Sequence, residues 1–223
     1  MVKEILHIVF PPKCIFCRNV LEDHSDINIC KSCFDKIPFQ NINGDSYLKI
    51  FNAPFCDAVI CPCRYESVIK KALTNFKFRD KPSLYRALAY FIIMTLDELI
   101  DREEIDIVAA VPLSSKRYRM RGYNQAGLLA AYLAKELHVV NASSIIKRSR
   151  DTQKQATLDK DKRGLNVFNA FNVIDYNYVG NKKVLIIDDI FTTGSTISEC
   201  AREFKNAGAA MVYAAVVASG RIY

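Results

Sequence analysis

Two adjacent acids and a hydroxyl-rich turn lie close together in the last quarter of the chain. Asp188 and Asp189 follow four aliphatic residues, and a Thr-Thr-Gly-Ser-Thr turn begins at Thr192. Adjacent carboxylates repel one another and lose hydration when covered, so core packing alone does not favour them there. A small-residue turn that leads into a helix offers backbone N–H groups and hydroxyls to a phosphate. Because two carboxylates can also accept hydrogen bonds from vicinal sugar hydroxyls, the stretch predicts a site for ribose 5-phosphate.

Two other interpretations of this stretch fit less well. A receiver-type phosphorylation site also ends an apolar strand with an acidic pair, but it would open a domain of about a hundred residues. Only 34 residues follow Asp189. A nucleotide P-loop requires GxxxxGK[ST], and the turn contains no lysine. The sugar-phosphate interpretation is therefore preferred.

Four cysteines near the N-terminus form two CxxC pairs, Cys14 with Cys17 and Cys30 with Cys33, separated by twelve residues. Each pair can direct two thiolates at one point, and two pairs complete a tetrahedron around Zn²⁺. Four protein ligands leave no open position, so we predict a structural site that stabilises a segment too small to form its own core. Residues 13–36 hold four basic and four acidic side chains, so we interpret this zinc ribbon as a scaffold or docking element.

The other cysteines do not repeat this spacing. Cys56, Cys61 and Cys63 lie irregularly in a stretch that reads as a strand, and Cys200 lies on an expected helix. Buried cysteine behaves as a small hydrophobic side chain. We therefore predict core packing for these four residues rather than a second metal site.

Short apolar runs alternate with amphipathic stretches after the ribbon. Strands are expected over 57–65, 105–113, 144–149, 170–174, 182–189 and 210–220, and helices over 66–78, 82–100, 124–139 and 196–208. Alternating strands and helices predict a doubly wound, mostly parallel α/β sheet. We predict a zinc ribbon over residues 1–40, a linker over 41–55 and the α/β domain over 56–223.

Polar segments follow three of the expected strands. These segments, 112–125, 147–155 and 188–196, are interpreted as loops rich in hydroxyls, amides and basic side chains. In open α/β sheets, ligands bind at the carboxyl ends of the strands. The three segments are therefore expected to converge on one site.

Charge and hydropathy limit the classes of ligand and location. The net charge is +7, and basic residues concentrate over 69–86, 115–121 and 147–163, which favours an anionic ligand such as a polyphosphate or a nucleic acid. Aromatic residues interleave with these basic residues, including Phe76, Phe78, Tyr118 and Tyr123, a pattern that suits single-stranded DNA. No apolar run approaches the roughly 20 residues of a membrane helix, and no signal peptide is apparent. We therefore expect a cytoplasmic protein without a membrane span.

The stretch around Asp188 closely resembles the binding loop of type I phosphoribosyltransferases, which hold 5-phosphoribosyl 1-diphosphate (PRPP). The cysteine pairs, "NFKFRDKPSL", "VPLSSKRYRMRGYNQA", "RDTQKQATLDKDKRGLNVFNAF" and this loop occur in one order along the chain. Together they resemble the ComF family, phosphoribosyltransferase-like proteins with an N-terminal zinc ribbon that are associated with bacterial DNA uptake. The resemblance implies a type I phosphoribosyltransferase-like fold preceded by a small zinc ribbon with four cysteine ligands.

The resemblance also implies roles for individual residues. Asp188 and Asp189 would bind the ribose hydroxyls with Mg²⁺ nearby, and the 5′-phosphate would be held by Thr192, Thr193, Gly194, Ser195 and Thr196. Segment 112–125 takes the place of the pyrophosphate loop, where Arg117, Arg119 and Arg121 would act as catalytic residues by neutralising the diphosphate, with Ser114 and Ser115 beside them. Lys154 would belong to a loop that closes over PRPP, and Lys77 and Arg79 are further candidates for the same anionic site.

Two functions remain open under this resemblance. One is transfer of phosphoribose to an acceptor, and the other is a non-catalytic PRPP- and DNA-binding adaptor that docks partners from the competence machinery, such as a DNA helicase or translocase. Relatives that salvage purines carry an aspartate where this chain has Thr192. The resemblance therefore does not imply purine salvage, and no motif in the sequence indicates a pocket for another acceptor base or amine.

Overall fold

The fold is centred on a parallel sheet, as the computed structural model shows. The structure describes residues 11–21, 27–40, 53–78, 81–149 and 168–220. Strands of the main sheet run in the order β1-β8-β7-β3-β4, with β2 also paired to β8, and every described pair in it is parallel. In chain order these strands are β1 (Ala58–Ile60), β2 (Cys63–Arg64), β3 (Ile107–Ala110), β4 (Val140–Asn141), β7 (Lys183–Phe191) and β8 (Met211–Ser219). The predicted α/β class is confirmed.

A second, two-stranded sheet lies outside the main one. Its strands, β5 (Ile146–Arg148) and β6 (Phe171–Val173), are antiparallel and pair Lys147 with Asn172. Both strands were expected from the sequence, but their separation from the main sheet was not.

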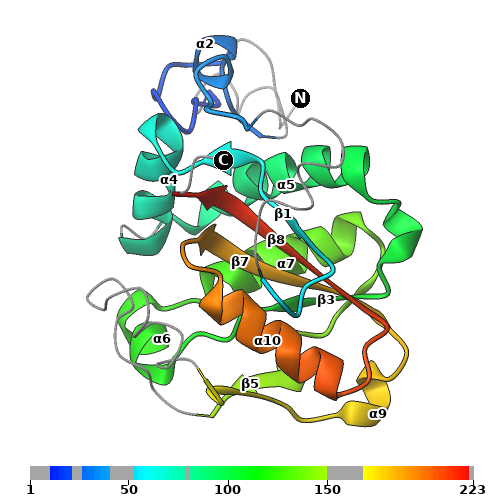
Figure 1. Ribbon diagram of the computed structural model, residues 1–223. Helices are drawn as coiled ribbons and strands as arrows, with labels where there is room; N and C mark the ends of the chain where they lie inside the picture. Colours follow the sequence, from blue (N-terminus) through cyan, green and yellow to red (C-terminus); the bar gives the residue numbers. More distant parts are fainter. Residues whose placement is uncertain (1–10, 22–26, 41–52, 79–80, 150–167, 221–223) are drawn as a thin grey trace, which may run out of the picture.

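Helices cover both faces of the main sheet (Figure 1). The α-helices are α2 (Lys31–Phe34), α4 (Ser67–Phe78), α5 (Tyr85–Leu99), α6 (Ser115–Arg121), α7 (Gln125–Glu136), α9 (Tyr176–Val179) and α10 (Ser195–Asn206). The described residues also form the short 3-10 helices η1 (Pro82–Leu84), η2 (Arg102–Glu104) and η3 (Ser143–Ile145). One buried core joins the sheet to α4, α5 and α7, and a second joins it to α10, β5 and β6.

Strand β7 contributes to both cores through alternation of its side chains. Leu185 and Ile187 belong to the core on the α5 and α7 side, whereas Val184 and Ile186 belong to the core on the α10 side. Successive side chains of a strand point to opposite faces of the sheet. Continued along β7, this alternation directs Asp188 toward α10 and Asp189 toward α4, which separates two carboxylates that neighbour each other in sequence.

One expected loop is a helix. Segment 112–125 was interpreted as a loop, but its middle forms α6. Ser114 accepts a hydrogen bond from the N–H of Arg117 at 3.4 Å, as an N-cap residue does, and Gly122 ends the helix with a left-handed φ of 76°. The interpretation as a loop was wrong because the basic side chains masked a capped helical turn.

The cysteine-rich segment packs directly onto the α/β domain. Cys14, Ile29, Cys33 and Ile37 belong to the same buried core as α4, α5 and α7, and Figure 1 places α2 beside α4 and α5. The rings of Phe34 and Phe39 lie 6.3 and 5.5 Å from that of Phe91 on α5. The ribbon thus shares its core with the larger domain.

The backbone also ties the ribbon to the sheet. Arg64 N–H donates to the carbonyl of Pro38 at 2.9 Å, and the side-chain amide of Gln40 donates to the carbonyls of Cys61 and Cys63 at 3.2 and 3.3 Å.

In the described part of the chain, no helix is both long and apolar enough to cross a bilayer.

Candidate functional site

A cavity of about 430 Å³ lies at the carboxyl ends of β3 and β7. Figure 1 shows that the arrowheads of β7 and β8 point to the side of the molecule where α4 and α6 lie. The charged residues that line the cavity are Lys77, Arg117, Arg121, Arg148, Asp188 and Asp189. Among the described residues, four cations thus surround two acids, a balance that suits an anionic ligand with hydrogen-bond donors.

Asp189 on β7 forms an ion pair with Lys77 on α4, a helix far from β7 in the sequence. Its Oδ1 atom lies 2.8 Å from Nζ of Lys77 on α4, and the two side chains are only 10% and 19% exposed. This pair confirms the direction that strand alternation gives to Asp189. Lys77 was only a secondary candidate in the sequence, because the end of an exposed helix offered an equally good explanation for it.

Asp188 is held by the backbone of its neighbour. Its Oδ1 atom accepts a hydrogen bond from the N–H of Asp189 at 2.8 Å. Burial is the main cause that raises the pKa of Asp188 to about 7; the charge of Asp189 acts in the same direction, whereas the charge of Lys77 lowers the pKa. The carboxyl group therefore titrates near neutral pH.

The basic helix α6 presents alternate arginines to the cavity. Arg117 and Arg121 are four residues apart, so they share one face of the helix, and both line the cavity. Burial lowers the pKa of the Arg121 guanidinium, whereas the charge of Asp189 raises it, and Nη1 of Arg121 donates to Oε1 of Gln125 at 2.8 Å. Arg119 is exposed and does not line the cavity.

The hydroxyl-rich turn forms the floor of a smaller hollow. This hollow of about 40 Å³ adjoins Asp188 and is lined by residues that include Thr192, Gly194, Ser195 and Thr196. The N-cap residue of α10, Gly194, provides no side-chain cap, and the Ser195 N–H donates to the Thr193 hydroxyl at 3.4 Å. The positive dipole end of α10 is directed at the turn. The Thr193 and Ser195 hydroxyls lie 2.9 Å apart.

Only glycine fits at the centre of the turn. Gly194 has a φ of 82°, in the left-handed region, and a Cβ atom there would lie 2.5 Å from Cζ of Phe191. The Phe191 ring is buried beneath the turn. Gly194 therefore lets the backbone approach the ring closely while the turn stays open toward Asp188.

The remaining sequence candidates are distributed differently. Ser114 and Ser115 line a separate hollow of about 470 Å³ that also adjoins Arg148. Thr193 lies in the turn but is not among the residues lining the main cavity or the small hollow at the turn. Lys154 and Arg79 lie outside the described residues.

Three polar residues of the cavity were not predicted as site residues. Tyr65 follows β2, Arg148 ends β5 and Asn124 precedes α7, where its side-chain amide donates to the carbonyl of Val111 at 3.1 Å. Arg148 lay inside a segment expected at the site, so it could have been singled out. Tyr65 could not, because only the pairing of β2 with β8 brings it to this edge.

The four ribbon cysteines form a second candidate site. Their Sγ atoms all lie within 4.8 Å of one another, which fits the tetrahedral thiolate coordination of Zn²⁺. Burial opposes ionisation of Cys14, but backbone N–H groups of Cys30, Cys17 and Phe16 outweigh it and lower the pKa of this thiol to about 6. At Cys14 the backbone is thus arranged to hold a thiolate, whereas burial raises the pKa of the Cys33 thiol.

The other cysteines pack as predicted. Cys61, Cys63 and Cys200 are fully buried, and burial raises the pKa of each thiol. Cys56 is partly buried and packs against the core on the α10 side. Among the described residues, the four ribbon cysteines form the only cluster of three or more groups placed to hold a metal ion.

Two family models match different parts of the chain. A model of the phosphoribosyl transferase domain matches residues 82–223, and a model of the double zinc ribbon domain matches residues 5–62. The first match includes the acids, the hydroxyl-rich turn and α6, whereas the second includes all four clustered cysteines.

Three similar proteins carry names that refer to competence or to DNA utilization. Competence protein F of Haemophilus influenzae is 27% identical over 207 residues, which cover 91% of this chain and 88% of that protein. DNA utilization protein YhgH of Escherichia coli is 37% identical over 107 residues, covering 48% of this chain and 46% of that one. Competence protein ComFC of Bacillus subtilis is 29% identical over 140 residues, covering 62% of this chain and 54% of that one.

The matched phosphoribosyl transferase domain contains most of the residues that line the cavity, whereas Tyr65 and Lys77 lie before it. The zinc ribbon also precedes this domain, as in the resemblance noted from the sequence. The chain belongs to the phosphoribosyl transferase domain family and, within it, to the ComF proteins with an N-terminal double zinc ribbon.

Proposed function

We propose that the cavity binds PRPP. The observation that carries this proposal is the placement of Asp188 and Asp189 between the hydroxyl-rich turn on one side and Arg117 and Arg121 on the other. The turn suits the 5′-phosphate, the acids suit the ribose hydroxyls and the arginines suit the diphosphate. The three parts of the ligand thus find matching groups in the order in which they are linked.

Mg²⁺ would enter this site with the ligand. Outside the cysteine cluster, the described residues form no group of three or more potential metal ligands, and one oxygen of Asp189 is already paired with Lys77. Mg²⁺ in phosphate sites keeps several waters and binds through substrate phosphates, so diphosphate oxygens and water would supply most of its coordination. The ion would add charge neutralisation at the leaving diphosphate.

The arginines would act as catalytic residues if transfer occurs. Loss of diphosphate from C1 of ribose leaves negative charge on the leaving group, and Arg117 and Arg121 are placed to neutralise it. Positioning and charge neutralisation would be the main contributions of the protein. The alternative is an adaptor that binds PRPP without turnover.

The names of the relatives favour a role in DNA uptake. A protein named for competence matches 91% of this chain, and one named for DNA utilization matches 48% of it. We infer that this chain acts in the cytoplasm in natural transformation, with the ribbon as the docking element for proteins such as a DNA helicase or translocase. The nearly balanced charge of residues 13–36 favours protein contacts over nucleic-acid contacts for the ribbon.

Titration calorimetry with PRPP and Mg²⁺ tests the binding proposal. Wild type should bind, and an Asp188→Asn/Asp189→Asn double variant should bind at least about 100-fold more weakly, because hydrogen bonds to charged groups contribute about 1.5–3 kcal/mol each. Unchanged affinity in the double variant would refute the site. Steady diphosphate release with a defined nucleophile would then show that the protein is a transferase. A full screen of nucleobases and amines without turnover would instead favour the adaptor.

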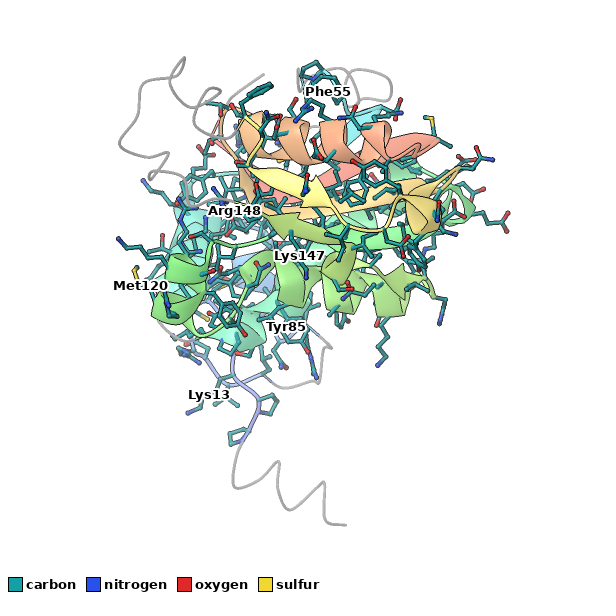
Figure 2. The ribbon with its side chains drawn as sticks, turned by 90° about the horizontal axis from the view of Figure 1, so that it is seen from below. Lys13, Phe55, Tyr85, Met120, Lys147 and Arg148 are labelled. Carbon is teal, nitrogen blue, oxygen red and sulfur yellow. The ribbon has the colours of Figure 1, made fainter. Side chains whose placement is uncertain are left out.

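Single-stranded DNA is a second candidate ligand, and the outer face of α6 favours it. Tyr118 is 52% exposed and Met120 is 61% exposed, beside exposed Lys116 and Arg119. Figure 2 shows Met120 at the outer margin of the molecule. Exposed aromatic rings between basic residues suit stacking of unpaired bases. A Tyr118→Ala variant should lose affinity for single-stranded oligonucleotides, and wild-type affinity that does not weaken as salt rises would exclude this surface.

A further inference from the structure

The two acids of the cavity each commit one oxygen to the protein. Oδ1 of Asp189 pairs with Lys77 at 2.8 Å, and Oδ1 of Asp188 accepts the N–H of Asp189 at 2.8 Å. Within the described residues, the second oxygen of either carboxylate accepts no hydrogen bond. Two acceptor oxygens, one from each acid, therefore remain for a ligand that carries two neighbouring hydroxyls.

Lys77 is itself held firmly at the end of α4. The preceding residue, Phe76, is fully buried, and its carbonyl accepts a hydrogen bond from the Tyr123 hydroxyl. The rings of Phe76 and Tyr123 also lie 6.0 Å apart. Because the backbone beside Lys77 is anchored by the buried Phe76 side chain and by the Tyr123 hydroxyl, its ammonium group reaches Asp189 from a defined direction.

We propose that Lys77 is a positioning residue for ribose recognition, which fixes the rotamer of Asp189 so that its second oxygen and that of Asp188 read two vicinal hydroxyls. This inference rests on the proposed phosphoribosyl site. Lys77 acts through Asp189 rather than on the ligand, and it would be the residue that lets the cavity discriminate ribose from 2-deoxyribose.

Lys77 has a second effect, because its charge lowers the pKa of Asp188 and so favours the ionised carboxylate. The titratable groups that share the cavity or an electrostatic interaction with this pair are Lys77 from α4, Arg117 and Arg121 from α6, Arg148 from β5, Cys200 from α10 and Tyr65. Lys77 is the cation that makes an ion pair with the acids at hydrogen-bonding distance. Without Lys77, Asp188 would hold its proton to higher pH, because burial and the charge of Asp189 would still raise its pKa.

Ribose 5-phosphate and 2-deoxyribose 5-phosphate are the matched probes. Both carry the same phosphate, so the ratio of their affinities isolates the missing hydroxyl and cancels titration of the phosphate. Calorimetry from pH 6 to 9 would compare wild type with Lys77→Met, Lys77→Arg and a control, Lys70→Met, which changes an exposed lysine on the same helix. Thermal unfolding would establish that each variant is folded, and Lys77→Gln replaces Lys77→Met if the latter is not.

Wild type, Lys70→Met and Lys77→Arg should prefer ribose 5-phosphate by about tenfold or more. Lys77→Met should reduce that ratio to less than about threefold and move its pH midpoint upward. A folded Lys77→Met variant with the wild-type ratio and midpoint would overturn the inference while leaving the proposed function intact. Wild type that binds neither sugar phosphate nor PRPP would instead overturn the proposed function, and this inference with it.

Discussion

The cysteine cluster and the acid-and-arginine cavity are two binding sites built on opposite plans. The first takes four identical ligands from a short segment, Cys14 to Cys33, whose sulfur atoms converge within 4.8 Å. The second collects unlike groups from α4, α6, β5, β7 and α10, which are spread over most of the chain. A closed site made of one residue type suits a structural metal, whereas an open site with separate acidic and basic parts suits a ligand with several functional groups.

The two sites are not mechanically separate. The cysteine cluster and α4, which carries Lys77, belong to one buried core through residues that include Cys33, Ile37, Leu73 and Phe76. Damage to the ribbon should therefore reach the cavity, whereas damage to the cavity should leave metal binding intact. Single substitutions at the two sites test this asymmetry.

Removal of one zinc ligand should have the largest effect. Structural zinc contributes on the order of 10 kcal/mol of apparent binding free energy in small zinc peptides, so Cys33→Ser should lose the metal and the packing of Phe34 and Phe39 on α5. For a chain of this size, we expect the thermal midpoint to fall by about 10 °C or more. Metal analysis and thermal unfolding would measure both effects.

Cys56→Ala is the matched control for this prediction, because Cys56 lies outside the cluster and packs against the other core. It should retain one zinc per chain. Substoichiometric zinc in undamaged wild-type protein would contradict the assignment of the ribbon.

Gly194→Ala should damage the cavity without affecting the ribbon. The new Cβ would meet Phe191 at 2.5 Å in a backbone with a φ of 82°, and such strain costs about 1–3 kcal/mol. We expect weaker PRPP binding, a thermal midpoint lower by about 4–10 °C and unchanged zinc content. Gly122→Ala shares the positive φ but meets no atom within 4 Å. A loss of stability as large in Gly122→Ala would show that the Phe191 contact is unimportant.

The arginines of α6 should differ in their contribution to PRPP binding. Arg117→Gln should reduce affinity about tenfold, which corresponds to about 1.4 kcal/mol, because Arg117 lines the cavity. Arg119→Gln should leave PRPP affinity unchanged, since Arg119 lies on the exposed face. Calorimetry at one fixed salt concentration would compare them, and equal losses would mean that only the overall charge of α6 matters.

The smallest expected effect is the pH dependence of the cavity. Burial raises the pKa of Asp188 to about 7, and the ionised form is the better acceptor for sugar hydroxyls, so PRPP affinity should rise severalfold from about pH 6 to 8. Asp188→Asn should remove this component, leaving only titration of the ligand. A wild-type profile identical to that of Asp188→Asn would contradict the role of this carboxylate.

The same shift has a consequence for stability. The folded-state pKa lies above the ordinary value of 3.8, so ionisation of Asp188 opposes folding. The ligand-free protein should therefore lose stability from this group as pH rises from about 4 to 7, and Asp188→Asn should show a flatter profile in denaturant unfolding.

Local patterns in the sequence were enough to predict the fold class, the zinc cluster and the core placement of the other cysteines. The CxxC spacing and the alternation of apolar runs with amphipathic stretches depend only on near neighbours. The ion pair of Lys77 with Asp189 and the placement of Tyr65 depend on how α4 and β2 pack. These contacts join residues far apart in the chain, so no local pattern indicates them.

The basic segment over 115–121 falls between these cases. Its arginines were expected near the diphosphate, but their division into an inner and an outer face follows from α6 being a helix. A loop would have allowed Arg117, Arg119 and Arg121 to converge together. Recognition of Ser114 as an N-cap and Gly122 as a helix end would have separated Arg119 from the other two.

Hydrogen–deuterium exchange with and without PRPP and Mg²⁺ tests the central claim most directly, because it locates the ligand along the chain. We predict protection in peptides that contain Asp188 to Thr196 and Arg117 to Arg121, with no change in those that contain Cys30 to Ile37. Protection confined to the ribbon, or none in the peptide with Asp188 to Thr196 at saturating PRPP, would contradict the cavity as the phosphoribosyl site.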